Sequence, residues 1–311
     1  MLTIFSTPKP FRGHIDIIQR NALKSWTLLH PIEVILFGDD QGAAEVASEF
    51  GLRHEPFVER HESGMKYLDY MFNRAQAIAR HDYLCYSNCD IILLGDFCEA
   101  LKKTIAWQKR FLLVSQRWDT DITTPVDFDR PDWQVNLHEL AARTGVRQSR
   151  AFVDYFAFQR GVYHSIPPLV IGRWYWDWWL VWKALSSGVP VVDATPCVTA
   201  IHQNHDYGYH PQGLQGTAKD AVALRNFQLA GGRKNLCNLE DATYELKPDG
   251  HFRRPWLRRE RAETWKFARD TYVRIWYSLL ALTSKARHGL GLSRQGMAEL
   301  RTRFGNGRNP K

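Results

Sequence analysis

The stretch CYSNCDIILL, residues 85–94, starts as an apolar, strand-like run, meets Asn88 and Asp90, and then becomes apolar again. In open α/β sheets, ligands bind outside the carboxyl ends of the strands. A carboxylate at such an end can hold a hard cation that bridges a diphosphate, and Asn88 beside it could bind a sugar or ribose hydroxyl. A simple turn formed by Asn88 and Asp90 is the alternative interpretation.

Apolar runs alternate with segments of helical periodicity on both sides of this stretch. The predicted strands are residues 2–6, 33–38, 82–87, 111–115, 152–158 and 190–194, and the predicted helices are 15–29, 42–50, 67–79, 97–107 and 174–186. The alternation predicts an α/β fold with a mainly parallel sheet flanked by helices. Residues 117–150 are polar and turn-rich, apart from a short helix near 137–144. We expect them to form a long irregular insertion, which is usually functional.

The positive charge of the chain is concentrated at its C-terminal end. The 311 residues carry a net charge of +8. Residues 251–311 contribute +11, from 12 Arg and 3 Lys against 4 acidic residues, so residues 1–250 carry −3. The basic composition therefore describes the tail and not the ligand of the main domain. We predict a main domain over residues 1–247 and a basic, partly amphipathic helical extension over 248–311.

The extension has features of a membrane-surface helix. Trp265, Tyr272 and Trp276 recur at helical spacing, with Arg269 and Arg274 nearby. A basic helix with aromatic anchors suits an anionic membrane surface. A helix packed on the main domain, with solvated arginines, is the alternative. No pattern typical of a nucleic-acid-binding module is present, so we expect no nucleic-acid partner.

The cysteines and the N-terminal sequence indicate a location inside the cell. The five cysteines include no C-x-x-C pair, which argues against a zinc site or a disulfide framework and favours a reducing compartment. We see no signal peptide in MLTIFSTPKPF and no apolar run near the roughly 20 residues of a membrane-spanning helix. The expectation is a cytoplasmic protein, with peripheral attachment to the inner face of the membrane through the tail.

Several segments, taken in order, resemble GT-A-fold, nucleotide-sugar-dependent glycosyltransferases. They are RNALKSW, VILFGDD, YSNCDIIL, IGRWYWDWWL and VVDATPCVTAIHQNHDY, and the last two are similar to a bacterial glycosyltransferase-like group. The resemblance covers about residues 1–246. It implies a GT-A-like, Rossmann-like fold and transfer of a sugar from a nucleoside-diphosphate donor, with a UDP-sugar expected. The acceptor would be a hydroxyl of a glycan or of a lipid-linked molecule.

The resemblance also implies roles for individual residues. The residues expected to bind the nucleotide or the sugar are Ser6, Thr7, Asp39, Asp40, Asn88 and Arg117. Asp90 and His202 are expected to hold Mn²⁺ or Mg²⁺. In the D-x-D motif of this group, Asn88 replaces the first acid, which leaves one strong metal carboxylate and makes metal dependence an open question. Arg117 has an alternative as a surface ion pair.

Asp177 is the candidate general base. It lies in WYWDWW, where a helix would place Trp174, Asp177 and Trp178 on one face. A carboxylate among indoles can have a raised pKa and accept a proton from the acceptor hydroxyl. Inverting enzymes of the resembled group carry their base on a comparable element. The alternative is a carboxylate that meets the helix dipole, and the tryptophans form either a sugar platform or core.

Two further functions fit the sequence. The segment IHQNHDYGYH offers His202, His205 and His210 together with Asp206, a cluster that could bind zinc in a metallohydrolase, although no H-E-x-x-H motif is present. A non-catalytic sugar- or nucleotide-binding protein at a membrane surface is the other alternative. The chain has no G-x-G-x-x-G motif and no G-x-x-x-x-G-K-[ST] motif.

Overall fold

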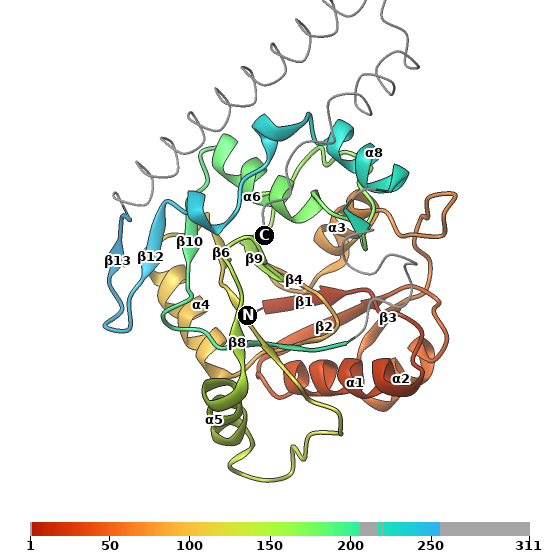
Figure 1. Ribbon diagram of the computed structural model, residues 1–311, viewed down its shortest axis with the longest axis vertical. Helices are drawn as coiled ribbons and strands as arrows, with labels where there is room; N and C mark the ends of the chain where they lie inside the picture. The colour runs from red at the N-terminus through yellow and green to blue at the C-terminus, as the bar shows by residue number, and fades with distance from the viewer. Residues whose placement is uncertain (1, 206–216, 219, 256–311) are drawn as a thin grey trace, which may run out of the picture. The chain divides into compact units, whose positions relative to one another are not determined.

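The computed structural model describes residues 2–205, 217–218 and 220–255, and its main feature is a nine-stranded sheet (Figure 1). The strand order is β13-β12-β10-β6-β9-β4-β1-β2-β3. The strands are β1 (Leu2–Ser6), β2 (Ile32–Phe37), β3 (Arg53–Glu55), β4 (Tyr83–Ser87), β6 (Leu112–Val114), β9 (Tyr155–Gln159), β10 (Val191–Asp193), β12 (Tyr244–Leu246) and β13 (Phe252–Arg253). All are parallel except β9 and β13. The predicted α/β fold with a mainly parallel sheet is confirmed.

Helices cover both faces of this sheet, as Figure 1 shows. One face carries α1 (Gly13–Thr27), α2 (Ala43–Glu49) and α4 (Gly95–Trp107), and the other carries α3 (Leu68–Ile78) and α6 (Trp176–Ser186). The short α8 (Ala221–Leu229) contacts the start of α6 through the rings of Phe227 and Tyr175, whose centroids are 5.2 Å apart. A sheet covered on both faces explains why its strands read as continuous apolar runs.

Two strands of a second, four-stranded sheet lie in the region that we expected to be irregular. Its order is β5-β11-β7-β8, from β5 (Ile91–Ile92), β11 (Ala200–Gln203), β7 (Arg117–Thr120) and β8 (Val146–Arg147). The helix α5 (Trp133–Thr144) starts earlier than predicted. Trp133, Leu137 and Ala141 repeat every four residues and pack on Ile92 and Ile201 of this sheet. The expectation of an irregular insertion over 117–150 was therefore wrong for β7, α5 and β8, whereas residues 121–132 form no helix or strand.

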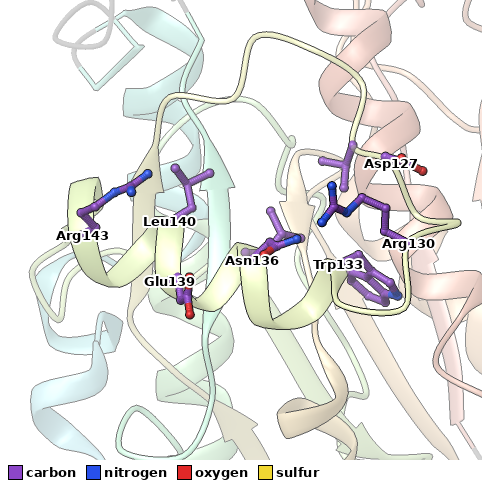
Figure 2. Close-up of a pocket in the computed structure, with 9 residues that line it drawn as sticks. Asp127, Arg130, Trp133, Asn136, Glu139, Leu140 and Arg143 are labelled. Atoms are coloured by element: carbon purple, nitrogen blue, oxygen red, sulfur yellow. The ribbon is translucent and has the colours of Figure 1, made fainter.

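A surface hollow of about 420 Å³ lies along α5 and the loop before it (Figure 2). Its lining residues are Val126, Asp127, Arg130, Trp133, Asn136, Leu137, Glu139, Leu140 and Arg143. None of the residues predicted to bind a donor, a metal or an acceptor lines this hollow. The residues predicted to be functional therefore lie outside this hollow.

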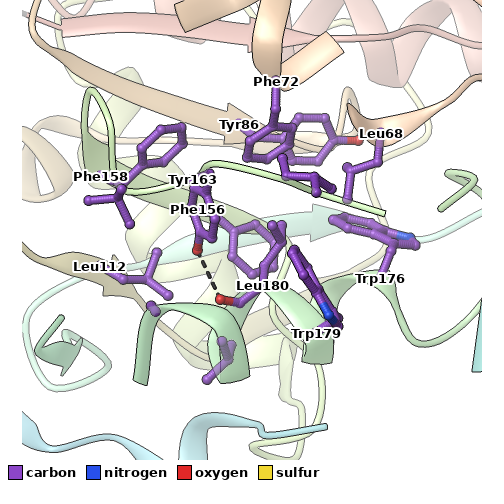
Figure 3. Packing of buried hydrophobic residues seen from close by; sticks show 14 of the residues in the cluster. Leu68, Phe72, Tyr86, Leu112, Phe156, Phe158, Tyr163, Trp176, Trp179 and Leu180 are labelled. Atoms are coloured by element: carbon purple, nitrogen blue, oxygen red, sulfur yellow. Dashed lines mark hydrogen bonds between the residues drawn. The ribbon is translucent and has the colours of Figure 1, made fainter. Parts of the chain in front are cut away.

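The core on the α3 and α6 side is dominated by aromatic rings (Figure 3). Phe72 stacks on Phe158 with ring centroids 5.7 Å apart, and Tyr163 donates a 3.1 Å hydrogen bond to the carbonyl of Leu180. Trp179 is 3 % exposed and belongs to this cluster together with Trp176. These two tryptophans of the WYWDWW segment are thus core residues and not part of a sugar platform.

Residues beyond 247 take part in the main sheet as far as the structure describes them. Strand β13 pairs antiparallel with β12, matching Leu246 with Phe252. The predicted tail helix, with Trp265 and Trp276, lies outside the described residues, so the domain boundary at 247/248 stays a prediction. Among residues 2–205, 217–218 and 220–255, no helix has the length and apolar character to cross a membrane.

Candidate metal and donor site

Three potential metal ligands converge at the carboxyl edge of the main sheet: Asp90, His202 and His205. Asp90 follows β4, and the pairing of His202 with Ile91 brings β11 beside it. Oδ2 of Asp90 lies 3.2 Å from Nε2 of His205 and 4.0 Å from Nε2 of His202. One ligand atom from each of the three residues lies within 4.8 Å of the others. His202 lies within β11, and His205 follows this strand.

The chemistry of this cluster fits a divalent cation. Oδ1 of Asp90 is buried and has no hydrogen-bond partner among the described residues, which is costly unless a ligand satisfies it. Burial by itself would raise the pKa of Asp90, but the hydrogen bond with His205 and the proximity of His202 and Lys9 hold the pKa well below its usual range. The carboxylate therefore stays ionised and can accept a cation.

A carboxylate on β7 contacts the ring nitrogen of His202 that does not face Asp90. Strand register places Asp119 opposite His202, and its Oδ1 lies 3.1 Å from Nδ1 of the imidazole. This contact leaves Nε2 directed at Asp90, which is the arrangement by which outer carboxylates orient metal-binding histidines. Arg117 donates from Nε to the same oxygen of Asp119 at 2.8 Å. Our sequence reasoning missed Asp119, although its spacing of two from Arg117 on one strand face was a usable signal.

Asp154 was also missed, and it organises two residues that were predicted to bind the donor. Arg117 donates from Nη1 to Oδ2 of Asp154 at 2.8 Å, and Asn88 donates from Nδ2 to Oδ1 at 2.6 Å. Tyr86 in turn donates to Oδ1 of Asn88 at 3.1 Å. The ion pair of Arg117 is buried and not at the surface. Direct contact of Asn88 or Arg117 with a donor stays a prediction.

Asp177 lies in the first turn of α6, two residues after Tyr175, whose backbone is strained. Tyr175 has φ 86° and ψ −16°, a conformation that is unusual for a bulky side chain and typical of functional sites. Because the helix starts only at Trp176, Trp174 does not share a helical face with Asp177, which corrects our expectation. Burial raises the pKa of Asp177 to about 7, and the negative charge of Asp154 adds to the shift.

The side chains at the end of β1 connect neighbouring strands. Ser6 donates to the carbonyl of Ser87 at 2.6 Å, and Thr7 donates to the carbonyl of Phe37 at 3.0 Å. These bonds hold the ends of β1, β2 and β4 together at one edge. The hydroxyls of Ser6 and Thr7 therefore shape the edge where a nucleotide would bind, and their contact with a nucleotide stays a prediction.

Asp39 and Asp40 follow β2 and differ in their environment. Asp39 is exposed and accepts a hydrogen bond from Arg60 at 2.5 Å. Asp40 is half-buried and pairs with Lys66, which is itself 7 % exposed. Burial lowers the pKa of Lys66, and the Asp40 carboxylate opposes that effect. Asp39 is thus the more accessible of the two carboxylates for a ribose or base.

Comparison with known proteins gives similarity of fold. No protein-family model matches the chain, and no curated protein matches it. Glucosyl-3-phosphoglycerate synthase from Mycobacterium tuberculosis with phosphoglyceric acid is 12 % identical, with a TM-score of 0.46 over 75 % of this chain and 81 % of that chain. The same synthase with Mn²⁺, UDP and phosphoglyceric acid gives 12 % identity and a TM-score of 0.44 over 75 % and 79 %.

A third similar structure is S. aureus TarS, residues 1–349. It is 10 % identical, with a TM-score of 0.36 over 52 % of this chain, and the match spans 47 % of the TarS chain, about half its length. The similarity concerns the fold.

Proposed function

We propose that this chain is a GT-A-like glycosyltransferase that moves a sugar from a nucleoside-diphosphate sugar to an acceptor hydroxyl. The observation that carries the proposal is the convergence of Asp90, His202 and His205 at the carboxyl edge of the sheet. Ligands of open α/β sheets bind at this edge. The order of motifs along the sequence supports the same activity.

Asp90, His202 and His205 would hold the metal ion. A bound divalent cation would supply positive charge that stabilises the leaving diphosphate. Carboxylate oxygen suits both Mg²⁺ and Mn²⁺, whereas imidazole is a ligand of transition metals. The mixed set therefore favours Mn²⁺ over Mg²⁺. Asp119 keeps the imidazole of His202 in a binding orientation.

Asp177 would take the proton of the acceptor hydroxyl. A general base works best when its pKa lies near the operating pH, and burial raises the pKa of Asp177 to about 7. The ion pair of Asp154 with Arg117 partly offsets the negative charge beside Asp177. Thr7, Asp39 and the adjacent strand ends would receive the nucleotide, with a UDP-sugar as the expected donor.

The acceptor is proposed to be a glycan or a lipid-linked molecule at a membrane. The net charge of +11 over residues 251–311 suits the anionic inner face of a membrane, where each Lys or Arg contributes about 1 kcal/mol. Binding to liposomes should then require anionic lipid and weaken as salt rises. Equal binding to neutral liposomes would remove the membrane from the proposal.

Calorimetric titration of UDP in the presence and absence of Mn²⁺ tests the proposed function. UDP should bind with Mn²⁺ present, and Asp90→Asn should lose that dependence, whereas Asp132→Asn, which changes an exposed carboxylate paired with Arg130, should behave as wild type. Absence of UDP binding to the wild type would contradict the proposal. Tightly held zinc together with hydrolysis of a substrate by water would favour the metallohydrolase, and binding without transfer would favour a non-catalytic binding protein.

A further inference from the structure

The loop that follows β1 is held at three consecutive residues. Thr7 donates to the last carbonyl of β2, and the buried Lys66 donates to the carbonyl of Pro8 at 2.8 Å. The buried side chain of Gln19, on α1, fixes the next residue at two points. Its Oε1 accepts from the backbone nitrogen of Lys9 at 2.6 Å, and its Nε2 donates to the carbonyl of Lys9 at 2.9 Å. The backbone of Lys9 therefore cannot shift without breaking two hydrogen bonds to a residue that is 2 % exposed.

The side chain of Lys9 extends from this fixed backbone and places its ammonium group beside the metal cluster. Nζ of Lys9 lies 3.4 Å from Nε2 of His205, which lies 3.2 Å from Oδ2 of Asp90. A protonated lysine has no lone pair, so it does not add a ligand to the cluster. Its charge would repel a bound cation, because like charges this close raise each other's energy. A further anion that contacts both charges removes this conflict.

We propose that Lys9 binds the diphosphate of the nucleotide donor, next to the cation site. This inference rests on the proposed function and assigns the diphosphate, rather than the nucleoside, to this residue. Lysine binds phosphate oxygens as a compact point charge with three donors. The two hydrogen bonds from Gln19 fix the backbone of Lys9 before the ligand binds. Binding therefore loses little free energy to ordering of the loop.

The experiment measures affinity for UDP and for uridine in the full chain with Mn²⁺ present. Lys9→Met should weaken UDP binding by about 10- to 100-fold, the loss expected for one hydrogen bond to a charged group. Uridine binding, followed by saturation-transfer NMR, should not change because uridine has no phosphate. Lys9→Arg should keep most of the UDP affinity. Lys102→Met removes an exposed lysine of α4 and serves as the matched control, with wild-type binding expected.

Binding of Mn²⁺ alone, followed by electron paramagnetic resonance, separates a phosphate contact from damage to the metal site. Lys9→Met should bind Mn²⁺ at least as tightly as wild type, because a nearby positive charge is gone. UDP affinity equal to wild type in Lys9→Met would overturn the inference, as would an equal loss for UDP and uridine. Lys9→Gln repeats the test if methionine destabilises the fold. A wild type that fails to bind UDP would instead contradict the proposed function itself.

Discussion

Asn88 donates a 2.6 Å hydrogen bond from its amide nitrogen to Oδ1 of Asp154. The oxygen of the same amide accepts from the hydroxyl of Tyr86 at 3.1 Å. The resembled D-x-D motif has a carboxylate at this position, but here a carboxylate already stands opposite, on the residue before β9. An amide can donate to that carboxylate, whereas a second carboxylate would repel it. Asn88 therefore fits beside Asp154 in a way that an aspartate at the same position would not.

Asn88→Asp, which restores the D-x-D motif, should destabilise the protein instead of adding a metal ligand. Asn88→Ala should lower the free energy of unfolding by about 1–3 kcal/mol, since one partner of a largely buried bond is lost. Asn88→Asp should lower it further at pH 8 and approach the alanine variant as the pH falls toward about 4, because the added carboxyl becomes protonated. Urea unfolding at the two pH values checks this. An aspartate variant as stable as wild type at pH 8 would contradict it.

Transfer activity should rise as the pH passes through about 7, because Asp177 must be ionised to accept a proton. Asp177→Asn should reduce the transfer rate by about 10²- to 10⁴-fold while leaving affinity for UDP unchanged. Initial rates from pH 5 to 9 and calorimetric UDP titration measure the two effects. A variant with the wild-type rate and pH profile would exclude Asp177 as the base.

Asp177→Asn should also change how the free energy of unfolding depends on pH. The pKa of Asp177 is raised in the folded state from its ordinary value of 3.8 to about 7. Its contribution to stability is therefore fully present below pH 3.8 and declines as the pH rises to about 7. Asparagine does not titrate, so Asp177→Asn should gain stability relative to wild type across this range. Parallel unfolding curves at all pH values would show that the pKa is not raised.

Asp119→Asn should weaken Mn²⁺ binding without removing a ligand. Loss of a carboxylate that orients a metal-binding histidine typically costs about 10- to 100-fold in affinity. Electron paramagnetic resonance of Mn²⁺ gives the affinity directly, independent of turnover. Asp82→Asn, which alters a carboxylate with a side chain that is 85 % exposed, is the control. Unchanged Mn²⁺ affinity in Asp119→Asn would show that His202 does not depend on this contact.

Tyr163→Phe tests the packing of α6 on the main sheet, away from the site. The hydroxyl of Tyr163 donates to the carbonyl of Leu180 inside the core (Figure 3). Its removal should lower the free energy of unfolding by about 1 kcal/mol and leave UDP and Mn²⁺ binding intact. Urea denaturation measures this loss. A much larger loss, or altered ligand binding, would indicate that α6 holds the site through this bond.

Six strands of the main sheet and the helices that flank it were predictable because buried strands and amphipathic helices have distinct periodicities in the sequence. The short strands β3, β12 and β13 were not predicted, because two or three residues give no periodicity. Asp90 was recognisable because it follows an apolar, strand-like run, and His202 was expected from the resemblance to GT-A glycosyltransferases. The second sheet was not predictable, because β5 and β8 are two residues long and give no periodicity. Tyr175 was missed because a positive φ at a tyrosine leaves no sequence signal of the kind that glycine provides.

Asp119 and Asp154 were missed for a different reason. Each acts through a partner that is far away in the sequence and near only through strand register. The pairing of β7 with β11 sets Asp119 against His202, and the antiparallel pairing of β9 with β4 sets Asp154 beside Asn88. Because a shift of one residue in register would reverse which side chains face each other, such contacts require the structure.

The most direct test of the central claim is release of UDP from a panel of UDP-sugars by the wild-type protein. Reactions are run with Mn²⁺, after chelation with EDTA, and after Mn²⁺ is restored, with Asp90→Asn alongside. We predict that at least one UDP-sugar is turned over with Mn²⁺, that chelation abolishes turnover reversibly, and that Asp90→Asn is inactive although folded. No turnover of any UDP-sugar in the panel, or turnover that persists in EDTA and in Asp90→Asn, would contradict a metal-dependent glycosyltransferase centred on Asp90.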